Sequence, residues 1–165
     1  MAESVVTDAM KALIGVERTG GTAEVTTTGI RMFARAVGHT DPIFYDEAAA
    51  KTQGYRGLVA PPGYLGTAIG RPPARGGETS GGEAGVPPGV GGPPIAYKRV
   101  LNGGTRYEYM EPIIAGDVIT SSSRLTEYRE REGSMGPMLI TYRETTYTNQ
   151  HGVAVARETG NIIQY

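Results

Sequence analysis

A stretch rich in glycine and proline divides this chain into two parts with different sequence patterns. Residues 70–94 hold nine of the 25 glycines and six of the 11 prolines in the 165-residue chain. Repeated Gly and Pro disfavour helix and strand, and so few apolar side chains cannot offset the entropy lost on ordering. We therefore expect a single domain, residues 1–165, with a loop inserted at about residues 70–100. Such a loop is either a solvent-exposed insertion or a lid or partner-contacting arm.

The residues before this insertion follow helical patterns. After Thr28, apolar residues recur at the i, i+3, i+4, i+7 intervals of an amphipathic helix, which we expect to end at Gly38. Asp46 is expected to cap a second helix that continues to Gly54. Three further elements are expected: a helix over residues 5–13, a strand over residues 22–27, and a helix over residues 61–69 that begins at its prolines.

The residues after the insertion have the β-branched and aromatic character of strands. Strands are expected around residues 105–109 and over residues 117–129, 138–148 and 153–165, with turns at 133–137 and 149–152. Asp117, which follows Gly116, is expected to be a turn residue. Helices followed by an antiparallel meander of four strands, one long enough to curl, indicate an α+β domain whose sheet wraps a helix.

Charge and composition argue against several classes of function. Lys and Arg number 16 against 17 Asp and Glu, so the chain lacks the basic excess that attracts nucleic acid or anionic membranes. With no Cys and only two His, we expect no disulfide, no thiol nucleophile and no metal site. The sequence has neither a signal-peptide pattern nor a spanning apolar stretch, so a cytoplasmic protein is expected.

Residues 36–46 read Ala-Val-Gly-His-Thr-Asp-Pro-Ile-Phe-Tyr-Asp, in the loop between two predicted helices. This segment resembles the active-site loop of the MaoC-like (R)-specific enoyl-thioester hydratases and dehydratases, whose motif is Gly-Asp-x-Asn-Pro-(aliphatic)-His. The resemblance covers most of the chain outside residues 70–100 and includes three further segments: residues 33–36, 55–60 and 111–117.

This resemblance implies a hot-dog fold, in which a curved antiparallel sheet wraps around a central helix, here the one that starts near Pro61. It also implies pairing of two such folds, with an acyl thioester of CoA or acyl carrier protein in a tunnel at their interface. In active members an Asp/His pair orients water and a backbone N–H polarises the thioester carbonyl. No cofactor is implied.

The motif positions carry other side chains in this sequence. The family's aspartate falls on His39, its asparagine on Asp41 and its histidine on Phe44, whose ring cannot transfer a proton. The family's next signature, Ala-His-Gly, falls on Ala-Pro-Pro at residues 60–62, and proline has no N–H to donate. An offset of one residue would place Gly63 at the carbonyl-polarising position instead.

The chain is therefore most similar to the degenerate N-terminal type of MaoC domain. The resemblance implies a non-catalytic, acyl-channel-forming subunit beside a sister MaoC-like chain that keeps the Asp/His dyad. The residues expected to contact the substrate are Phe44, Tyr45, Pro62, Gly63 and Tyr64. Two alternatives remain: a self-sufficient homodimeric hydratase that uses His39 and Asp41 as an acid/base pair, and a non-catalytic module that binds acyl thioesters.

Overall fold

The computed structural model describes residues 4–67, 97, 99–134 and 136–165. Most of the insertion predicted at residues 70–100 lies outside these ranges. The elements, with η for a 3-10 helix, are α1 (Asp8–Lys11), β1 (Glu17–Glu24), α2 (Thr27–Ala36), η1 (Pro42–Phe44), α3 (Glu47–Thr52), η2 (Tyr64–Gly66), β2 (Val100–Tyr109), β3 (Val118–Gly133), β4 (Gly136–Thr148) and β5 (Ala154–Gln164).

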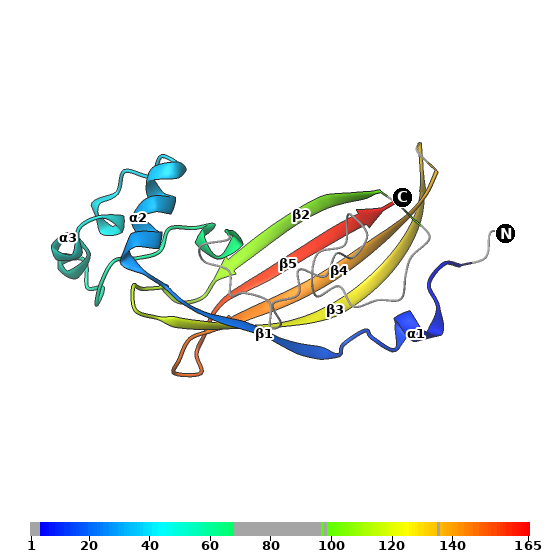
Figure 1. The fold of residues 1–165 in the computed structure, drawn as a ribbon, viewed down its shortest axis with the longest axis horizontal. Coiled ribbons are helices and arrows are strands. Elements are labelled where there is room, and N and C mark those ends of the chain that lie inside the picture. The colour runs from blue at the N-terminus through cyan, green and yellow to red at the C-terminus, as the bar shows by residue number, and fades with distance from the viewer. Residues whose placement is uncertain (1–3, 68–96, 98, 135) are drawn as a thin grey trace.

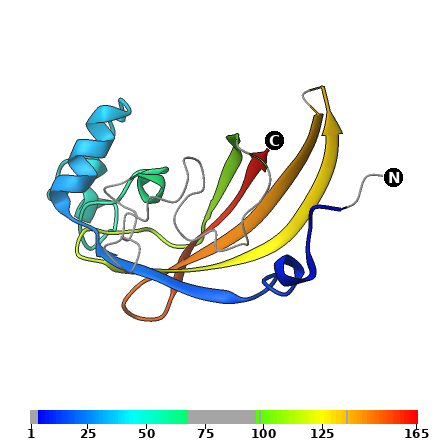
Figure 2. The same ribbon diagram turned by 45° about the vertical axis from the view of Figure 1, so that its right-hand side comes forward.

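The strands form one antiparallel sheet in the order β1-β3-β4-β5-β2. The sheet is curved, and α2 and α3 gather at one end of it (Figure 1; Figure 2). The predicted α+β class with an antiparallel sheet is confirmed. The central helix predicted over residues 61–69 is represented among the described residues only by the short η2, and its end lies outside them. Within the described ranges no helix has the length and apolar content needed to span a bilayer.

The predicted four-strand meander is wrong for β2. Only β3, β4 and β5 follow one another as neighbours, whereas β2 pairs with β5 at the far edge of the sheet. The edge beside β3 is taken by β1, which pairs with it through Glu17↔Arg124 to Glu24↔Val118. Pairing between strands distant in sequence is set by tertiary contacts, which explains why the residue pattern alone predicted the wrong neighbour.

Helix boundaries follow the capping residues. The strand predicted over residues 22–27 lies earlier, at Glu17–Glu24, because Thr26 instead caps α2 by accepting a hydrogen bond from the Gly29 amide at 3.0 Å. Asp46 caps α3 as predicted and accepts from the Ala48 amide at 2.8 Å. The N-terminal helix predicted over residues 5–13 is shorter, Asp8–Lys11, and is capped by Thr7.

The core lies between α2 and the concave face of the sheet. Ile30 and Ala34 of α2 are fully buried and share one apolar cluster with Ile119, Tyr147 and Val155 of the strands. Full burial of an aliphatic side chain such as Ile30 contributes roughly 2 kcal/mol. Because side chains alternate along a strand, the same alternation that turns Tyr147 toward α2 places Thr141, Arg143 and Thr145 of β4 on that face too.

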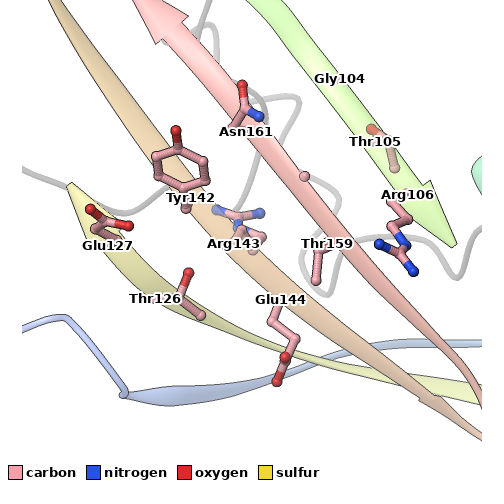
Figure 3. A pocket seen from close by; sticks show the side chains of 11 residues that line it. Gly104, Thr105, Arg106, Thr126, Glu127, Tyr142, Arg143, Glu144, Thr159 and Asn161 are labelled. Carbon is pink, nitrogen blue, oxygen red and sulfur yellow. The ribbon is translucent and has the colours of Figure 1, made fainter. Parts of the chain in front are cut away.

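The opposite, outer face of the sheet carries charged side chains, and Figure 3 shows Glu127, Tyr142 and Glu144 among the residues that line a hollow there. Arg124 of β3 lies 2.6 Å from Glu144 of β4, and Arg129 pairs with Glu127 at 2.8 Å. The Arg129 guanidinium also lies 5.1 Å from the ring centre of Tyr142. A hollow of about 580 Å³ follows this face. Ion pairs this exposed contribute at most about 1 kcal/mol each to the stability of the fold. The outer face that carries them is in contact with water.

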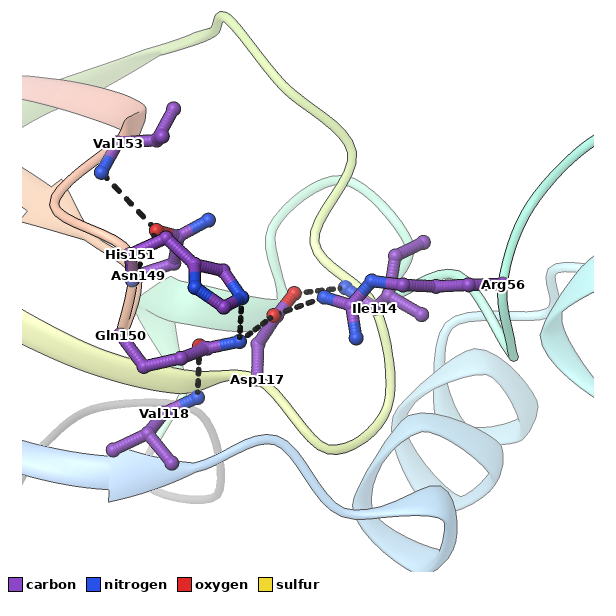
Figure 4. Close-up of polar contacts among 8 residues, drawn as sticks. All are labelled: Arg56, Ile114, Asp117, Val118, Asn149, Gln150, His151 and Val153. Carbon is purple, nitrogen blue, oxygen red and sulfur yellow. Dashed lines mark hydrogen bonds and ion pairs between the residues drawn. The ribbon is translucent and has the colours of Figure 1, made fainter.

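A buried carboxylate joins the helical segment to the sheet (Figure 4). Asp117 closes the predicted turn before β3, but it is 0% exposed. Its Oδ2 accepts from the Ile114 amide at 2.8 Å, and its Oδ1 accepts from the Gln150 side-chain amide at 3.1 Å and pairs with Arg56. One side chain thus connects the loop after α3, the approach to β3 and the β4–β5 hairpin.

Replacing this carboxylate should destabilise the fold. Asp117→Ala leaves the Ile114 amide buried without its acceptor and frees Arg56 and Gln150, so we expect the free energy of unfolding to fall by about 3 kcal/mol. Chemical denaturation of the purified chain measures this change. The matched control is Asp8→Ala, an aspartate that is 98% exposed and pairs with Lys11, with an expected loss below about 0.5 kcal/mol. Equal losses in the two variants would contradict the role given to Asp117.

Candidate functional site

The loop that follows α2 carries the first set of predicted site residues. Gly38 leaves the helix with a φ of +76°, and the His39 amide then donates to the carbonyl of Ala34 at 2.9 Å. This conformation favours glycine and ends α2 where the sequence predicted. The loop next turns through η1 and enters α3, so His39, Asp41, Phe44 and Tyr45 lie on one short connection.

His39 and Asp41 have separate partners. The Asp41 carboxylate caps η1 and accepts from the Ile43 amide at 3.1 Å, while its side chain lies at the exposed surface. The His39 ring is half-buried and tilts against Phe44, with ring centres 5.4 Å apart. Both residues belong to the described chain, and no hydrogen bond or ion pair joins their side chains there. The geometry therefore holds no assembled acid/base pair within this chain.

Phe44 and Tyr45 hold the loop against the core. Phe44 is 8% exposed and belongs to the apolar cluster. The Tyr45 hydroxyl donates to the backbone carbonyl of His39 at 2.6 Å, and its own carbonyl accepts two bonds from Arg31, at 2.9 and 3.0 Å. Phe44 and Tyr45 thus hold the loop by packing and by a hydrogen bond within it, and Arg31 bonds the loop to α2.

The second set of predicted site residues precedes and enters η2. Pro62 is exposed, Gly63 has a φ of +90°, and Tyr64 is 1% exposed with its ring edge-on to Phe33 at 6.0 Å. The Gly63 amide donates to the Tyr109 hydroxyl of β2 at 2.7 Å. A carbonyl that accepted from this N–H would have to displace that hydroxyl.

The structure brings part of the predicted site together. The Val59 amide donates to the carbonyl of Ile43 at 3.2 Å, which joins the two segments. Phe44 and Tyr64 share the apolar cluster, and Tyr45 packs against it. His39 is only half-buried, and Asp41 and Pro62 lie at the surface. The substrate-contacting role expected for these residues stays a prediction.

Two tyrosines near these segments have a raised pKa. Burial raises the pKa of Tyr64, an effect that nearby Thr26 partly offsets, and no described residue forms a hydrogen bond of normal geometry with its hydroxyl. Burial also raises the pKa of Tyr109; the Gly63 amide opposes this shift and the Glu158 charge adds to it. Both hydroxyls therefore keep their protons at neutral pH.

A cavity on the concave face was not anticipated from the sequence. It has a volume of about 240 Å³, and its walls come from β2, β4 and β5. Thr141, Thr145 and Glu158 contribute polar groups, and the Glu158 carboxylate accepts from the Tyr147 hydroxyl at 2.5 Å. The period-two alternation of β4 could have shown that its polar residues share a face, but not that the face is hollow.

Within the described part of the chain, His, Asp and Glu side chains do not gather in a group of three that could hold a metal ion. The charged groups beside the site are already engaged, Arg31 with the Tyr45 carbonyl and Arg56 with Asp117. His39 and Asp41 keep side chains that can exchange a proton, and the other predicted site residues offer hydrogen bonding and apolar contact.

The sequence matches a family model described as FAS1-like, dehydratase domain region, over residues 12–158. A UPF0336 protein of Parafrankia sp. (strain EAN1pec) is 34% identical over 137 residues, which is 81% of this chain and 79% of that protein. A UPF0336 protein of Thermobifida fusca (strain YX) is 32% identical over 111 residues, covering 67% of this chain and 66% of that protein.

Solved structures of dehydratases share the fold. The ChsH1-ChsH2 complex from Mycobacterium tuberculosis contains a chain with a TM-score of 0.68 and 18% identity, covering 98% of this chain and 89% of that one. The C-terminally truncated HadBC (3R-hydroxyacyl-ACP dehydratase) complex from the same organism gives 0.66 and 20%, covering 92% and 96%. A MaoC-like dehydratase from Rhodospirillum rubrum gives 0.63 and 18%, covering 92% of each chain. The likeness shows the hot-dog architecture of MaoC-like dehydratases.

The unpaired hydroxyl of Tyr64 predicts a variant that is more stable than the natural chain. Tyr64→Phe removes a buried hydroxyl that has no hydrogen-bond partner of normal geometry, so we expect the free energy of unfolding at neutral pH to rise by about 1 kcal/mol. Because the pKa of Tyr64 is raised in the folded state, the unfolded chain ionises first above pH 10.0 and stability falls there. Tyr64→Phe should make this decline shallower.

Denaturant unfolding across this pH range measures both effects. Tyr55→Phe, at a half-buried ring outside the apolar cluster, is the matched control and should leave the stability at neutral pH unchanged. A Tyr64→Phe variant less stable than the natural chain at neutral pH would mean that the hydroxyl has a partner.

Proposed function

This chain belongs to the FAS1-like dehydratase domain family, and we propose that within it the chain is a non-catalytic, acyl-channel-forming subunit. The complex it would complete is a heteromeric MaoC-like (R)-enoyl-thioester hydratase or 3-hydroxyacyl-thioester dehydratase, acting on CoA or acyl carrier protein thioesters in the cytoplasm. Its sister chain would keep the Asp/His dyad. We treat residues 1–165 as one domain of this assembly.

The observation that carries this proposal is the environment of Phe44. The MaoC motif places its histidine at this position, and the phenyl ring found there can neither take nor give a proton. Its side chain packs in the apolar cluster, in contact with the half-buried His39 ring. An unpaired Asp or His buried at such a place would cost a few kcal/mol, whereas Phe is stable there and presents apolar surface to an acyl group.

Two further observations support a channel-forming role rather than a catalytic one for this chain. Asp41 is used as the cap of η1, and the Gly63 amide is occupied by the Tyr109 hydroxyl. Asp41 and the Gly63 amide, two of the groups that could orient water or polarise a carbonyl, are therefore engaged within the fold. The structural relatives named for HadBC and ChsH1-ChsH2 are heteromeric complexes, which supports a sister subunit here.

Co-expression tests this proposal directly. The partner to try is a hot-dog chain that carries the Gly-Asp-x-Asn-Pro-(aliphatic)-His motif, such as one encoded by an adjacent gene. We expect the two chains to co-purify and to hydrate crotonyl-CoA, while the present chain alone shows no turnover above the solvent background. Loss of ultraviolet absorbance of the enoyl thioester measures the rate.

Two substitutions separate the alternatives. Replacing the partner's motif histidine by Ala should abolish activity of the complex, whereas His39→Ala in the present chain should change it by less than about twofold. Turnover by this chain alone that disappears in His39→Ala would instead support the homodimeric hydratase. Thioester binding by the present chain with no capture of a motif-bearing partner would support the non-catalytic binding module.

A further inference from the structure

Strand β2 contains an irregular step at the sequence Asn102-Gly103-Gly104. In the pairing of β2 with β5, Asn102 lies opposite Ile162. Gly104, two residues further on, lies opposite the next residue of β5, Asn161. Gly103 is thus the extra residue of a β-bulge, and a bulge leaves its extra residue without a ladder partner. The peptide between Asn102 and Gly103 therefore lies where regular strand pairing is interrupted.

The same step is open to water. Asn102, Gly103 and Gly104 are all exposed, and β5 is the one neighbour of β2 among the strands that the structure describes. A Cβ at Gly103 would overlap the Asn161 side chain, so a larger residue fits there only if that side chain moves. Water therefore reaches the Asn102 side chain, and the following residue has no side chain to shield it.

The Asn102 side chain folds back over the two glycines. Its Oδ1 accepts from the Gly104 amide at 2.9 Å, the bond by which an Asn side chain closes a turn over its own backbone. Asn102 Cγ and the Gly103 nitrogen both belong to the ring that this bond closes, which limits how far apart they can move. The Gly104 N–H also stabilises negative charge that develops on Oδ1 when Cγ is attacked.

We propose that Asn102 is a site of spontaneous deamidation, in which the Gly103 backbone nitrogen attacks Asn102 Cγ. The attacking nitrogen gives its proton to water, and the new C–N bond closes a five-membered succinimide. The bond from Cγ to the side-chain nitrogen breaks, and that nitrogen takes up a proton and leaves as ammonia. One water molecule then opens the ring at either carbonyl and leaves aspartate or isoaspartate. Attack within one chain is favoured because the reacting atoms are already held together.

The product differs from the natural chain in charge and in main-chain length. Either product places a carboxylate where the Asn102 amide was, on the wall of the concave-face cavity. Isoaspartate also routes the main chain through Cβ, which adds one atom to β2 at the bulge. This reactivity is independent of the acyl-channel role proposed above.

The other two asparagines of the chain are internal controls. Asn149 closes the same kind of turn, since its Oδ1 accepts from the His151 amide at 3.0 Å, but the residue that follows it is Gln150. Asn161 is followed by the β-branched Ile162 in β5, which is paired on both sides. A side chain on the following residue crowds the nitrogen that would have to attack, and glycine has none.

Peptide mapping of the folded, full-length chain tests the proposal. After incubation at physiological temperature and mildly alkaline pH, trypsin places each asparagine in its own peptide: residues 100–106, 144–157 and 158–165. The amide-to-acid mass change should accumulate in peptide 100–106 at least about tenfold faster than in the other two. Part of the product should be isoaspartate, because only opening of a succinimide that contains the Gly103 nitrogen yields this isomer. Electron-transfer fragmentation distinguishes the two acids.

Two variants assign the reaction to the Gly103 nitrogen. Asn161→Ala removes the side chain that a Cβ at position 103 would overlap, and it should leave the conversion of Asn102 unchanged. Gly103→Ala in the Asn161→Ala background should slow that conversion at least about tenfold. Thermal unfolding checks that both variants fold.

Several results would overturn the proposal. These are conversion of Asn102 no faster than that of Asn149, aspartate formed without isoaspartate, and a rate that Gly103→Ala leaves unchanged. Conversion in the urea-unfolded chain with none in the folded chain would also contradict it, because the fold would then protect Asn102. Since none of these measurements involves a thioester or a sister chain, their failure leaves the proposed function untouched.

Discussion

The buried carboxylate of Asp117 is the contact on which the arrangement of this fold depends. A carboxylate removed from water must have its charge and its lone pairs satisfied, and here the partners are the nearby Ile114 amide and two side chains distant in sequence, Arg56 and Gln150. Satisfying Asp117 therefore fixes Arg56 and the loop after α3 against the β4–β5 hairpin at Gln150. The same region of the chain is held by backbone bonds from Gly116 to Val25 and from Ala115 to Leu58. The loops that carry the candidate site are connected to the sheet through these contacts of Asp117. The contacts explain how a short helical segment keeps a defined position at the end of a long sheet.

What could be predicted from the sequence was local. Capping residues and glycines predict α2 and α3, and long β-branched runs predict β3, β4 and β5. Each of these patterns lies within a few residues of the element that it predicts. The sequence patterns of the edge strands are weaker, and β1 reads Glu-Arg-Thr-Gly-Gly-Thr-Ala-Glu. The place of β1 in the sheet is set by its pairing with residues about a hundred positions away. The turn at Asp117 could be read from Gly116, but its burial could not, because a turn aspartate is usually solvated and two of its three partners, Arg56 and Gln150, lie 61 and 33 residues away.

In the candidate site, too, the local features could be predicted from the sequence and the contacts between distant residues could not. The order of His39, Asp41 and Phe44 along one loop follows from the sequence, and the 3-10 turn that Asp41 caps is a local structure. The bond between Gly63 and Tyr109 spans 46 residues and the insertion between them, so no local pattern predicts that the Gly63 amide is already occupied. The hollow beside Thr141 depends on the register that places Gly160 opposite Arg143, a property of the assembled sheet and not of either strand.

Polar groups have different surroundings on the two faces of the sheet. On the outer face, Arg124 and Arg129 find carboxylates on the same or a neighbouring strand, so each charge is satisfied by the protein and by water. On the concave face, Glu158 is satisfied by Tyr147, but Thr141 is buried beside empty volume with its hydroxyl unpaired. On this face burial in the fold, and not contact with water, decides whether a polar group has a partner.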